Sequence, residues 1–599
     1  MLLTKSDWKS LLQSVSRPGD DSTYLLAGGF QRIKSPTVIP MRKLVLLYGP
    51  NSAGKSTVLD ILSMLNSLWV DGIEGKTASL VSRWRRNDGD LPLSVGFSML
   101  ISQRAWLTSI GAKKWVPVVI TDKGFTPGSS EMDSAERRIT WIAKWEGAAS
   151  EAADTTVRFD VFVGESLLAS FRHDPDTDKP TIKIMNVPFE GLLGNLGPYI
   201  SDPEGEYEGN IPENPELQCD YLKPFSSYIP GRQRSEIDEL IRLIFAVPLF
   251  IYAGDMIAEP SSYLGPLRWI PRSHELRFLE IPPERVEDLN FDFFKTAEDV
   301  AITSKQVCSL FDRPSDGRFE WRILAANFAF DSDASRPGYT EEDENSFVDE
   351  ASQADIVGTS CVDEMQKSEE SLIDQINRWL AHEEFLGTSY RISANLSRIV
   401  SVASSKESAP SGSNKAQSEV GNHIVTFELV DEADRTFEFR DVGTGFSQVL
   451  PVLICCAVHK NITILEQPEL HLHPRLQAKL LDLLLESINK SRSSIAYSGD
   501  NTCRYDDALL LADRRKCLVV ESHSEHIVLR LMRRIHESSA ADIKHKRLHV
   551  KPSDVAVIYF EPEGDETYVH ILELTNDGDF ADRWPQGFFD ERYQEMFDE

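Results

Sequence analysis

The sequence predicts an α/β fold in which short parallel strands are buried on both faces and alternate with helices. Three continuous apolar runs predict these strands, at residues 44–48, 462–465 and 517–520. Apolar residues with helical spacing follow the first two runs, at 56–69 and 475–487. Strands of a parallel sheet that is covered on both sides have this near-continuous apolar composition.

The 599-residue chain has an ordinary globular composition but is strongly acidic. Hydrophobic residues make up 41% and charged residues 26%, which excludes a collagen, a coiled-coil rod and a wholly disordered chain. Asp and Glu outnumber Lys and Arg by 94 to 63, so the formal net charge is −31. Because coating DNA without regard to sequence requires clustered Lys and Arg, this acidity argues against a bulk DNA-coating protein. A local basic groove is still compatible with it.

The cysteines and the apolar runs indicate a cytoplasmic protein. The seven cysteines are scattered and form no C-x-x-C pair, which indicates reduced thiols rather than a disulfide framework or a zinc module. The N-terminus is too polar for a secretory signal. The longest apolar runs, near 243–252 and 449–458, are far shorter than the ~20 residues that span a membrane, so no membrane partner is expected.

The first apolar run leads into the sequence GPNSAGKS, which matches the phosphate-binding pattern G-x-x-x-x-G-K-[ST]. Glycines let the backbone wrap around phosphates, Lys55 places a cation between the β- and γ-phosphates, and Ser56 supplies a hydroxyl to Mg²⁺. The helix that follows directs its positive end at the anion. No NKxD-like guanine motif follows, which favours ATP over GTP. The predicted nucleotide-binding residues are Gly49, Pro50, Asn51, Ser52, Ala53, Gly54, Lys55, Ser56 and Thr57.

Polar side chains follow the other two apolar runs at the points where the strands end. Glu466 ends the run 462–465, and a carboxylate in that position holds Mg²⁺ and its waters. His523 follows the run 517–520 and can reach a γ-phosphate or the attacking water. Two plainer interpretations are open, since a strand-end acid also caps loops and a group of histidines can bind a metal. The histidines in question are His471, His473, His523 and His526.

A second glycine-rich turn precedes an apolar helix at residues 441–451, DVGTGFSQVLP. Glycines and a serine directly ahead of a helix make another anion-binding helix start. One triphosphate rarely needs two such loops, but a dimer does, because the second loop can close over the γ-phosphate held by the partner. We therefore predict that Gly445, Ser447 and Gln448 contact nucleotide, with a plain turn as the alternative.

The order of these motifs resembles an ABC-type ATPase head of the SMC/OLD-like branch, and most closely the bacterial AAA-type predicted ATPase families. The resemblance covers roughly the first 70 and the last 170 residues and a patch near 263–280. The segments that carry it are GPNSAGKST, YLGPLR, VGTGFSQVLPVL, ILEQPELHLHP, ESHSEHIVLRLMRRI and WPQGFFD.

The resemblance implies a role for each motif. It implies that the Walker A loop and Glu466 of Walker B hold MgATP, that the turn with Gly445 is the signature loop acting in trans, and that His523 is the switch histidine. HLHP matches the D-loop at a dimer seam. Such heads enclose two ATP molecules between two protomers, and hydrolysis reopens the assembly. A homodimer, or a higher assembly of dimers, is therefore expected.

The resemblance also implies how the chain is divided. Residues 1–110 and 426–599 are expected to form the two parts of one ATPase head, and residues 111–425 a large α+β insertion between Walker A and the signature motif. The insertion lacks sustained heptads, so no long coiled-coil arm is expected. Its expected features, in chain order, are an acidic loop, a stretch of helical spacing and a mobile loop at 331–370, 372–400 and 401–420.

One residue departs from the ordinary ABC pattern. The position after the Mg²⁺-holding acid normally carries the glutamate that orients water, and here it is Gln467. A neutral amide orients water but cannot accept its proton, and losing a general base costs on the order of 10²–10⁴-fold in rate. Glu469 is our candidate for that base, and we expect slow hydrolysis. Gln103 is a candidate Q-loop residue.

Three functions fit these motifs. The first is an ATPase that controls a partner effector, a nuclease or toxin, in the anti-phage setting that the resemblance implies. The second is a DNA repair or recombination ATPase that clamps DNA with local basic clusters. The third is a nucleotide-sensing scaffold with negligible turnover. The basic clusters are Arg83, Arg85 and Arg86, then Arg530, Arg533 and Arg534, and finally residues 544–551.

Overall fold

The computed structural model of the chain describes residues in seventeen ranges. These are 22–71, 80–84, 92–102, 118–121, 124–127, 136–146, 156–173, 181–185, 206–210, 262–270, 279–280, 315–328, 371–399, 422–458, 462–489, 517–539 and 546–581, with gaps at 31, 34 and 82 and inside 315–328. Several predicted features lie outside them: the run 243–252, the loops 331–370 and 401–420, Gln103, Arg85, Arg86 and the WPQGFFD segment.

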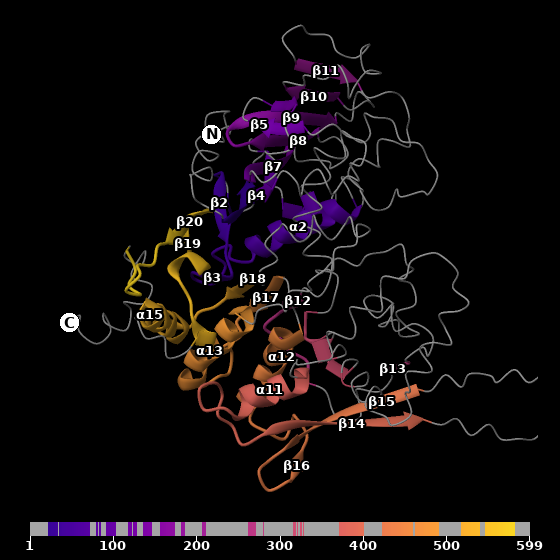
Figure 1. Cartoon of the computed structure of the whole chain (residues 1–599), viewed down its shortest axis with the longest axis vertical. Helices are drawn as coiled ribbons and strands as arrows, with labels where there is room; N and C mark the ends of the chain where they lie inside the picture. Colours follow the sequence, from indigo (N-terminus) through magenta and orange to yellow (C-terminus); the bar gives the residue numbers. More distant parts are fainter. Residues whose placement is uncertain are drawn as a thin grey trace, which may run out of the picture.

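A six-stranded sheet forms the centre of the molecule (Figure 1). Five of its strands are parallel, and the last pairs antiparallel at one edge. In sheet order the strands are β12 (Ser262–Leu264), β17 (Ile462–Glu466), β18 (Cys517–Glu521), β3 (Leu44–Tyr48), β19 (Val555–Glu563) and β20 (Glu566–Leu572). The predicted α/β class is confirmed, and the three apolar runs are neighbouring strands of one sheet.

The strands serve two cores because successive side chains point to opposite faces. On β3, Val45 and Leu47 belong to one core, whereas Leu44, Leu46 and Tyr48 belong to the other. Figure 1 shows the described helices beside the sheet, with α2 next to one face and the others beside the rest. The helices are α2 (Thr57–Asp71), α11 (Leu372–Ala381), α12 (Thr444–Val458), α13 (Pro474–Asn489) and α15 (Glu525–Ser539). Of the described helices, none is long and apolar enough to cross a membrane.

An antiparallel eight-stranded sheet packs against α2 from the side opposite the central sheet (Figure 1). The expected boundary near residue 110 falls between two strands of this sheet that pair directly, β4 and β7. In sheet order the strands are β11 (Glu206–Asn210), β10 (Thr181–Met185), β9 (Ser166–His173), β8 (Thr156–Val163), β7 (Glu136–Glu146), β4 (Leu93–Ser102), β1 (Thr23–Gly28) and β2 (Thr37–Met41). A separate hairpin joins β5 (Val118–Thr121) and β6 (Gly124–Pro127).

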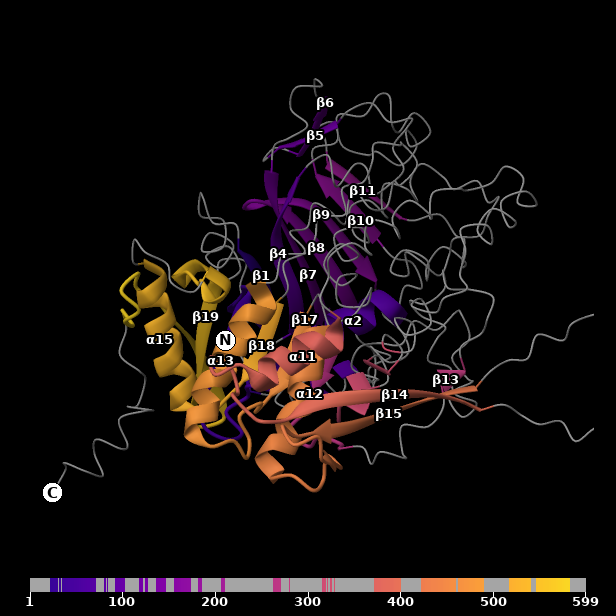
Figure 2. The same ribbon diagram turned by 60° about the horizontal axis from the view of Figure 1, so that its bottom comes forward.

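The prediction of helical spacing over 372–400 is wrong in its second half. Helix α11 ends at Ala381, and residues 391–399 form strand β14 (Arg391–Ile399), which pairs along its length with β15 (Asn422–Val430). The sequence RISANLSRI alternates apolar and polar residues, and this period of two suits a strand. Figure 2 shows this ribbon running past α11 and α12. Two short strands complete the sheet, β13 (Leu279–Glu280) and β16 (Thr436–Phe437).

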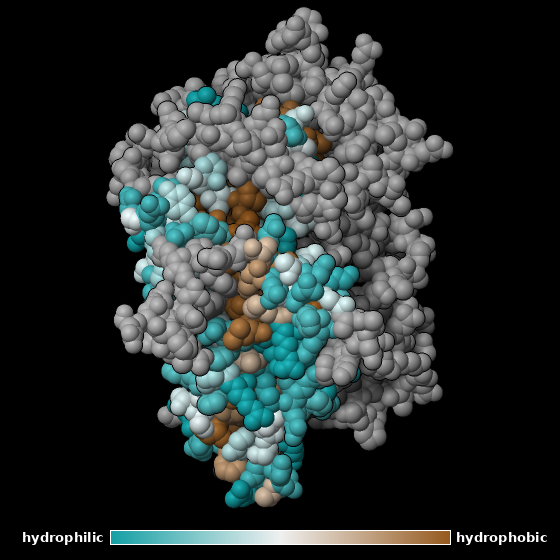
Figure 3. Space-filling view, turned by 90° about the vertical axis from the view of Figure 1, so that its left-hand side faces the viewer, coloured by the Kyte–Doolittle hydropathy of each residue, from teal (hydrophilic) through white to brown (hydrophobic). Residues whose placement is uncertain are grey.

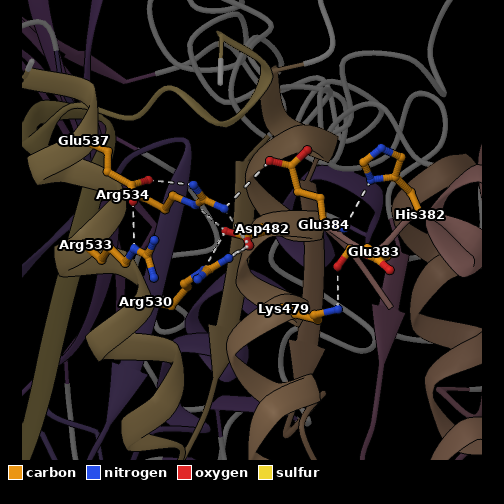
Figure 4. A network of polar contacts seen from close by, with 9 residues as sticks. All are labelled: His382, Glu383, Glu384, Lys479, Asp482, Arg530, Arg533, Arg534 and Glu537. Atoms are coloured by element: carbon orange, nitrogen blue, oxygen red, sulfur yellow. Dashed lines mark hydrogen bonds and ion pairs between the residues drawn. The ribbon is translucent and has the colours of Figure 1, made fainter. Parts of the chain in front are cut away.

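The arginines of α15 are engaged in ion pairs within the protein, so they do not form the free basic cluster that DNA binding would use. Arg530 and Arg534 both bind the buried carboxylate of Asp482 on α13, and Arg533 and Arg534 bind Glu537 (Figure 4). A buried carboxylate needs such partners, because leaving the charge unpaired is strongly unfavourable. The contacts therefore hold α13 to α15.

Candidate nucleotide site

The predicted phosphate loop lies between the end of β3 and the start of α2. Three of its residues have left-handed backbone conformations, with φ of 141° at Gly49, 62° at Ser52 and 93° at Gly54. A backbone in which left-handed residues alternate with right-handed ones forms the concave nest of N–H groups that binds anions. Gly49 is also required by space, since a Cβ there would lie 2.6 Å from the carbonyl oxygen of Phe560 on β19.

Lys55 is buried under this loop with only 3% of its surface exposed. Its Nζ donates to the carbonyl oxygens of Gly49 and Pro50, at 3.0 Å and 2.9 Å, and lies 3.6 Å from Oε1 of Glu521. Burial lowers the pKa of Lys55, and the negative charge of Glu521 opposes that shift. The lysine is thus held at the edge of the sheet where the strand-end acids gather.

Glu466 and Glu521 are neighbours at this edge, because they are paired positions at the ends of the parallel strands β17 and β18. Tyr263 of β12 donates its hydroxyl to Oε1 of Glu466 at 2.8 Å. Burial raises the pKa of Glu521, Lys55 opposes this, and the charge of Glu466 adds to it. Two adjacent acids beside one lysine make a site that favours an added cation.

The residues at this edge fit Mg²⁺ when it arrives with a phosphate. Oε2 of Glu521 is buried and has no hydrogen-bond partner within the described part of the chain. Ser56 is exposed at the start of α2, and burial raises the pKa of Asp60, one turn later, to about 6. Mg²⁺ commonly takes one or two protein carboxylates and completes its shell with substrate phosphates and water.

In the part of the chain that the structure describes, no metal site made of protein ligands alone is found. Among the described residues, no group of three or more His, Cys, Asp or Glu side chains is placed to hold a metal ion. The group in question, His471, His473, His523 and His526, lies within those residues. The interpretation of these histidines as a metal cluster therefore finds no support.

Glu469 and His523 lie together behind the strand-end acids. The backbone N–H of His523 donates to Oε1 of Glu469 at 2.8 Å. Burial raises the pKa of the Glu469 carboxyl, and burial followed by the charge of Lys55 lowers the pKa of His523. The imidazole is therefore neutral at neutral pH, and its Nε2 has no hydrogen-bond partner among the residues described.

Gln467 occupies a strained position between the two glutamates of the ILEQPE segment. Its φ is 45°, a left-handed value that non-glycine residues rarely adopt, and its N–H donates to the carbonyl of Glu521 at 2.8 Å. Such strain persists only where the surrounding structure enforces it, and it often marks functional sites. The turn after β17 is thus fixed to the end of β18.

The predicted signature residues lie at the start of α12, next to the HLHP turn. A Cβ at Gly445 would lie 2.4 Å from the carbonyl oxygen of His471, so the two loops pack in direct contact. Ser447 is 5% exposed and donates its hydroxyl to the carbonyl of Phe439. In this chain that hydroxyl faces inward, whereas Gly443 and Thr444 are the exposed residues at the helix start.

Arg268 joins the signature helix to the Walker B turn. Its guanidinium donates to the carbonyl oxygens of Glu466 and Gln467 at 3.0 Å and 2.8 Å, and to that of Gln448 at 3.4 Å. Burial lowers the pKa of Arg268 to about 10, and Glu469 opposes the shift, so the group is charged at neutral pH.

Among the predicted residues, the structure gathers the phosphate loop, Glu466, Gln467, Glu469 and His523 at one edge of the sheet. Sequence reasoning missed four residues there: Asp60, Tyr263, Arg268 and Glu521. Glu521 meets the same strand-end criterion as Glu466, so that signal was present. The contacts of Tyr263 and Arg268 join residues about 200 positions apart, so no local sequence pattern predicts them.

Comparisons with known proteins agree with this geometry. The family described as "AAA domain, putative AbiEii toxin, Type IV TA system" matches residues 309–529. The family described as "Protein of unknown function (DUF3696)" matches residues 550–598. A search of curated proteins found no match.

Many solved structures also match, at low similarity. The SMC head domain with an extended coiled coil from Pyrococcus furiosus, bound to the C-terminal domain of ScpA, is 10% identical; the match covers 92% of this chain and 96% of that one, with a TM-score of 0.32. The SMC head domain from Thermotoga maritima is 9% identical over 93% and 100% of the two chains, with a TM-score of 0.28. Scores this low carry no argument. The AAA domain match, which covers less than half of the chain, agrees with the predicted P-loop ATPase, as do the sheet order and the loop between β3 and α2.

Proposed function

We propose that the chain binds ATP with Mg²⁺, hydrolyses it slowly, and forms a homodimer around the nucleotide that regulates a partner effector. One observation carries the proposal. The parallel neighbours β17, β18 and β3 bring Glu466, Glu521 and the loop with Lys55 to one edge of the central sheet. Ligands of α/β proteins bind at this carboxyl edge.

Different residues of the chain contact different parts of MgATP in this proposal. The loop of residues 49–56 surrounds the β- and γ-phosphates with N–H groups, and Lys55 exchanges its carbonyl partners for phosphate oxygens. Ser56 and Glu466 are the residues that would hold Mg²⁺, which supplies positive charge to the phosphates when bound. Phosphoryl transfer depends mainly on such positioning and charge stabilisation.

The residues that activate water are Glu469, Gln467 and His523. Burial raises the pKa of Glu469, which makes its carboxylate a stronger base than an ordinary glutamate. We assign Glu469 as the general base, Gln467 as the amide that orients water, and neutral His523 as a hydrogen-bond partner of the γ-phosphate. Because one oxygen of Glu469 already accepts the N–H of His523, the two residues act together.

The signature loop supports the dimer. Gly443 and Thr444 are exposed at the N-terminus of α12, where backbone N–H groups and the helix dipole attract an anion. No phosphate of the same chain is needed there, so we assign this helix start to the nucleotide of the partner. The family match whose description names a toxin system supports a setting in phage defence, with a nuclease or toxin as effector.

The proposal is tested by phosphate release and by solution mass, each measured with and without ATP and Mg²⁺. Wild type is expected to hydrolyse ATP slowly and to double its mass with ATP. Glu466→Gln should lower turnover by about 10²-fold or more, and Glu469→Gln by about 10²–10⁴-fold. Glu432→Gln, which changes an exposed acid in the turn after β15, is the matched control.

The outcomes separate the functions. Nucleotide-dependent mass without phosphate release above background would replace the enzyme with a sensing scaffold. Equal turnover in wild type and Glu466→Gln would reject the site.

A further inference from the structure

The C-terminal hairpin of β19 and β20 contacts the phosphate loop at two places. At one place, the carbonyl of Phe560 on β19 packs against Gly49. At the other, the buried hydroxyl of Thr567 on β20 donates to the carbonyl oxygen of Ala53 at 2.8 Å. Thr567 is only 3% exposed.

Thr567 also holds the segment that runs between β1 and β2. Its backbone N–H donates to the carbonyl oxygen of Arg32 at 2.8 Å. A Cβ on Gly54 would lie 3.1 Å from the Cβ of Arg32, so this segment packs against the loop as well. One residue of β20 therefore ties together the loop and the segment beside it.

The bond to Ala53 fixes a peptide plane that matters for phosphate. A trans peptide is planar, and its C=O and N–H point in opposite directions. When Thr567 holds the Ala53 carbonyl from the side of β20, the N–H of Gly54 must point away from β20. Gly54 has the left-handed φ of the anion-binding nest, so this N–H belongs to the phosphate cradle.

The next residue along β20 has the opposite environment. Tyr568 is 44% exposed, and its side chain points to the other face of the strand. Figure 3 views the side of the molecule that carries α15 and this hairpin in Figure 1, and hydrophobic residues form only narrow patches there between hydrophilic ones.

We propose that the β19–β20 hairpin is part of the nucleotide site and that Thr567 is a positioning residue that presets the phosphate loop. The inference rests on the proposed ATPase function. It gives a role to the first part of the segment that matches a family of unknown function, residues 550–598. Thr567 acts through Ala53 and contacts no substrate itself.

The test compares Thr567→Val, which keeps the shape and removes the hydroxyl, with Thr567→Ser, which keeps the hydroxyl. Thr567→Val should weaken ATP binding about tenfold, because the buried carbonyl of Ala53 loses the hydroxyl that donates to it. It should also speed hydrogen–deuterium exchange of peptides covering residues 49–58 in nucleotide-free protein. Thr567→Ser should stay within about twofold of wild type in both measurements, as should Tyr568→Phe on the exposed side.

Unchanged exchange and unchanged affinity in Thr567→Val would overturn the inference, and so would a serine variant as defective as the valine variant. A wild type that binds no ATP would reject the proposed function alone, because the exchange measurement on the free protein would still decide whether the hairpin holds the loop. A general loss of stability is distinguished by thermal unfolding, in which a local effect leaves the midpoint near that of wild type.

Discussion

Two glycine-rich turns of this chain lead into buried helices, yet they are built differently. In the phosphate loop, Gly49 and Gly54 have positive φ and enclose a buried lysine. In the signature loop, neither Gly443 nor Gly445 has positive φ, and the serine hydroxyl is bonded to a carbonyl of its own chain. The first has the backbone geometry of a phosphate-binding nest, whereas the second offers an exposed helix start.

The difference shows that glycine has two separate uses in these loops. At Gly54 it permits a backbone conformation that turns N–H groups inward. At Gly445 it permits close approach of another chain segment, the carbonyl of His471. The phosphate loop is therefore shaped by its own backbone turns, whereas the signature loop is shaped by its contact with the HLHP turn.

The largest expected effect comes from removing the lysine of the first loop. Lys55→Ala should lower ATP affinity by about 100-fold or more, because a buried cation that meets the phosphates is lost and the carboxylate of Glu521 remains. Equilibrium binding of ATP measures the effect. Lys551→Ala, at an exposed position before β19, should bind like wild type. Normal affinity in Lys55→Ala would remove the distinction between the two turns.

A pair of glycine substitutions sharpens the comparison at the second loop. Gly445→Ala should reduce turnover about tenfold and leave ATP affinity within about twofold, because its Cβ displaces the HLHP turn without touching the cradle. Gly443→Ala, whose Cβ would meet nothing within 4 Å in its own chain, should keep the ATP affinity of wild type and lose less turnover than Gly445→Ala. Steady-state kinetics and ATP binding check this. Equal defects in the two variants would show that contact with His471 is not the reason for the glycine.

The same two turns show what could be predicted from sequence. The phosphate loop, the strand before it and the helix after it are encoded within about 25 consecutive residues, and all three were found where predicted. The position of Glu466 could also be predicted from the apolar run that precedes it. By contrast, the inward bond of Ser447 depends on the backbone at Phe439, and Gly445 is explained by a turn 26 positions later.

Prediction of the sheets was limited in the same way, because strand pairs join distant parts of the chain. The eight-stranded sheet was not predicted as a sheet, since antiparallel pairing such as β4 with β7 joins residues tens of positions apart. The strand at 391–399 was mistaken for helix because its apolar residues fit both periods over so short a stretch. Contacts that define the site across the chain, such as that of Arg268, depend on the completed fold.

The smallest effect concerns the acids at the two helix starts. Asp60 lies in the first turn of α2, whereas the first turn of α12 has no acid. Burial raises the pKa of Asp60 to about 6 from an ordinary 3.8, with Glu466 adding to the shift and Arg83 opposing it. A raised carboxyl pKa means that the folded state holds its proton more tightly. The stabilisation is therefore complete below about pH 4 and is lost as the pH rises through 6.

Asp60→Asn removes that loss, so the variant should be more stable than wild type at pH 8, by about 1–2 kcal/mol after allowance for partial exposure, and should lose the advantage at pH 4. Urea unfolding at pH 4, 6 and 8, without nucleotide or divalent cations, measures the difference. Asp441→Asn, at the exposed acid before the signature helix, should follow wild type at every pH. A stability difference between Asp60→Asn and wild type that does not change with pH would mean that burial and Glu466 do not raise the pKa of Asp60. The first helix start would then resemble the second.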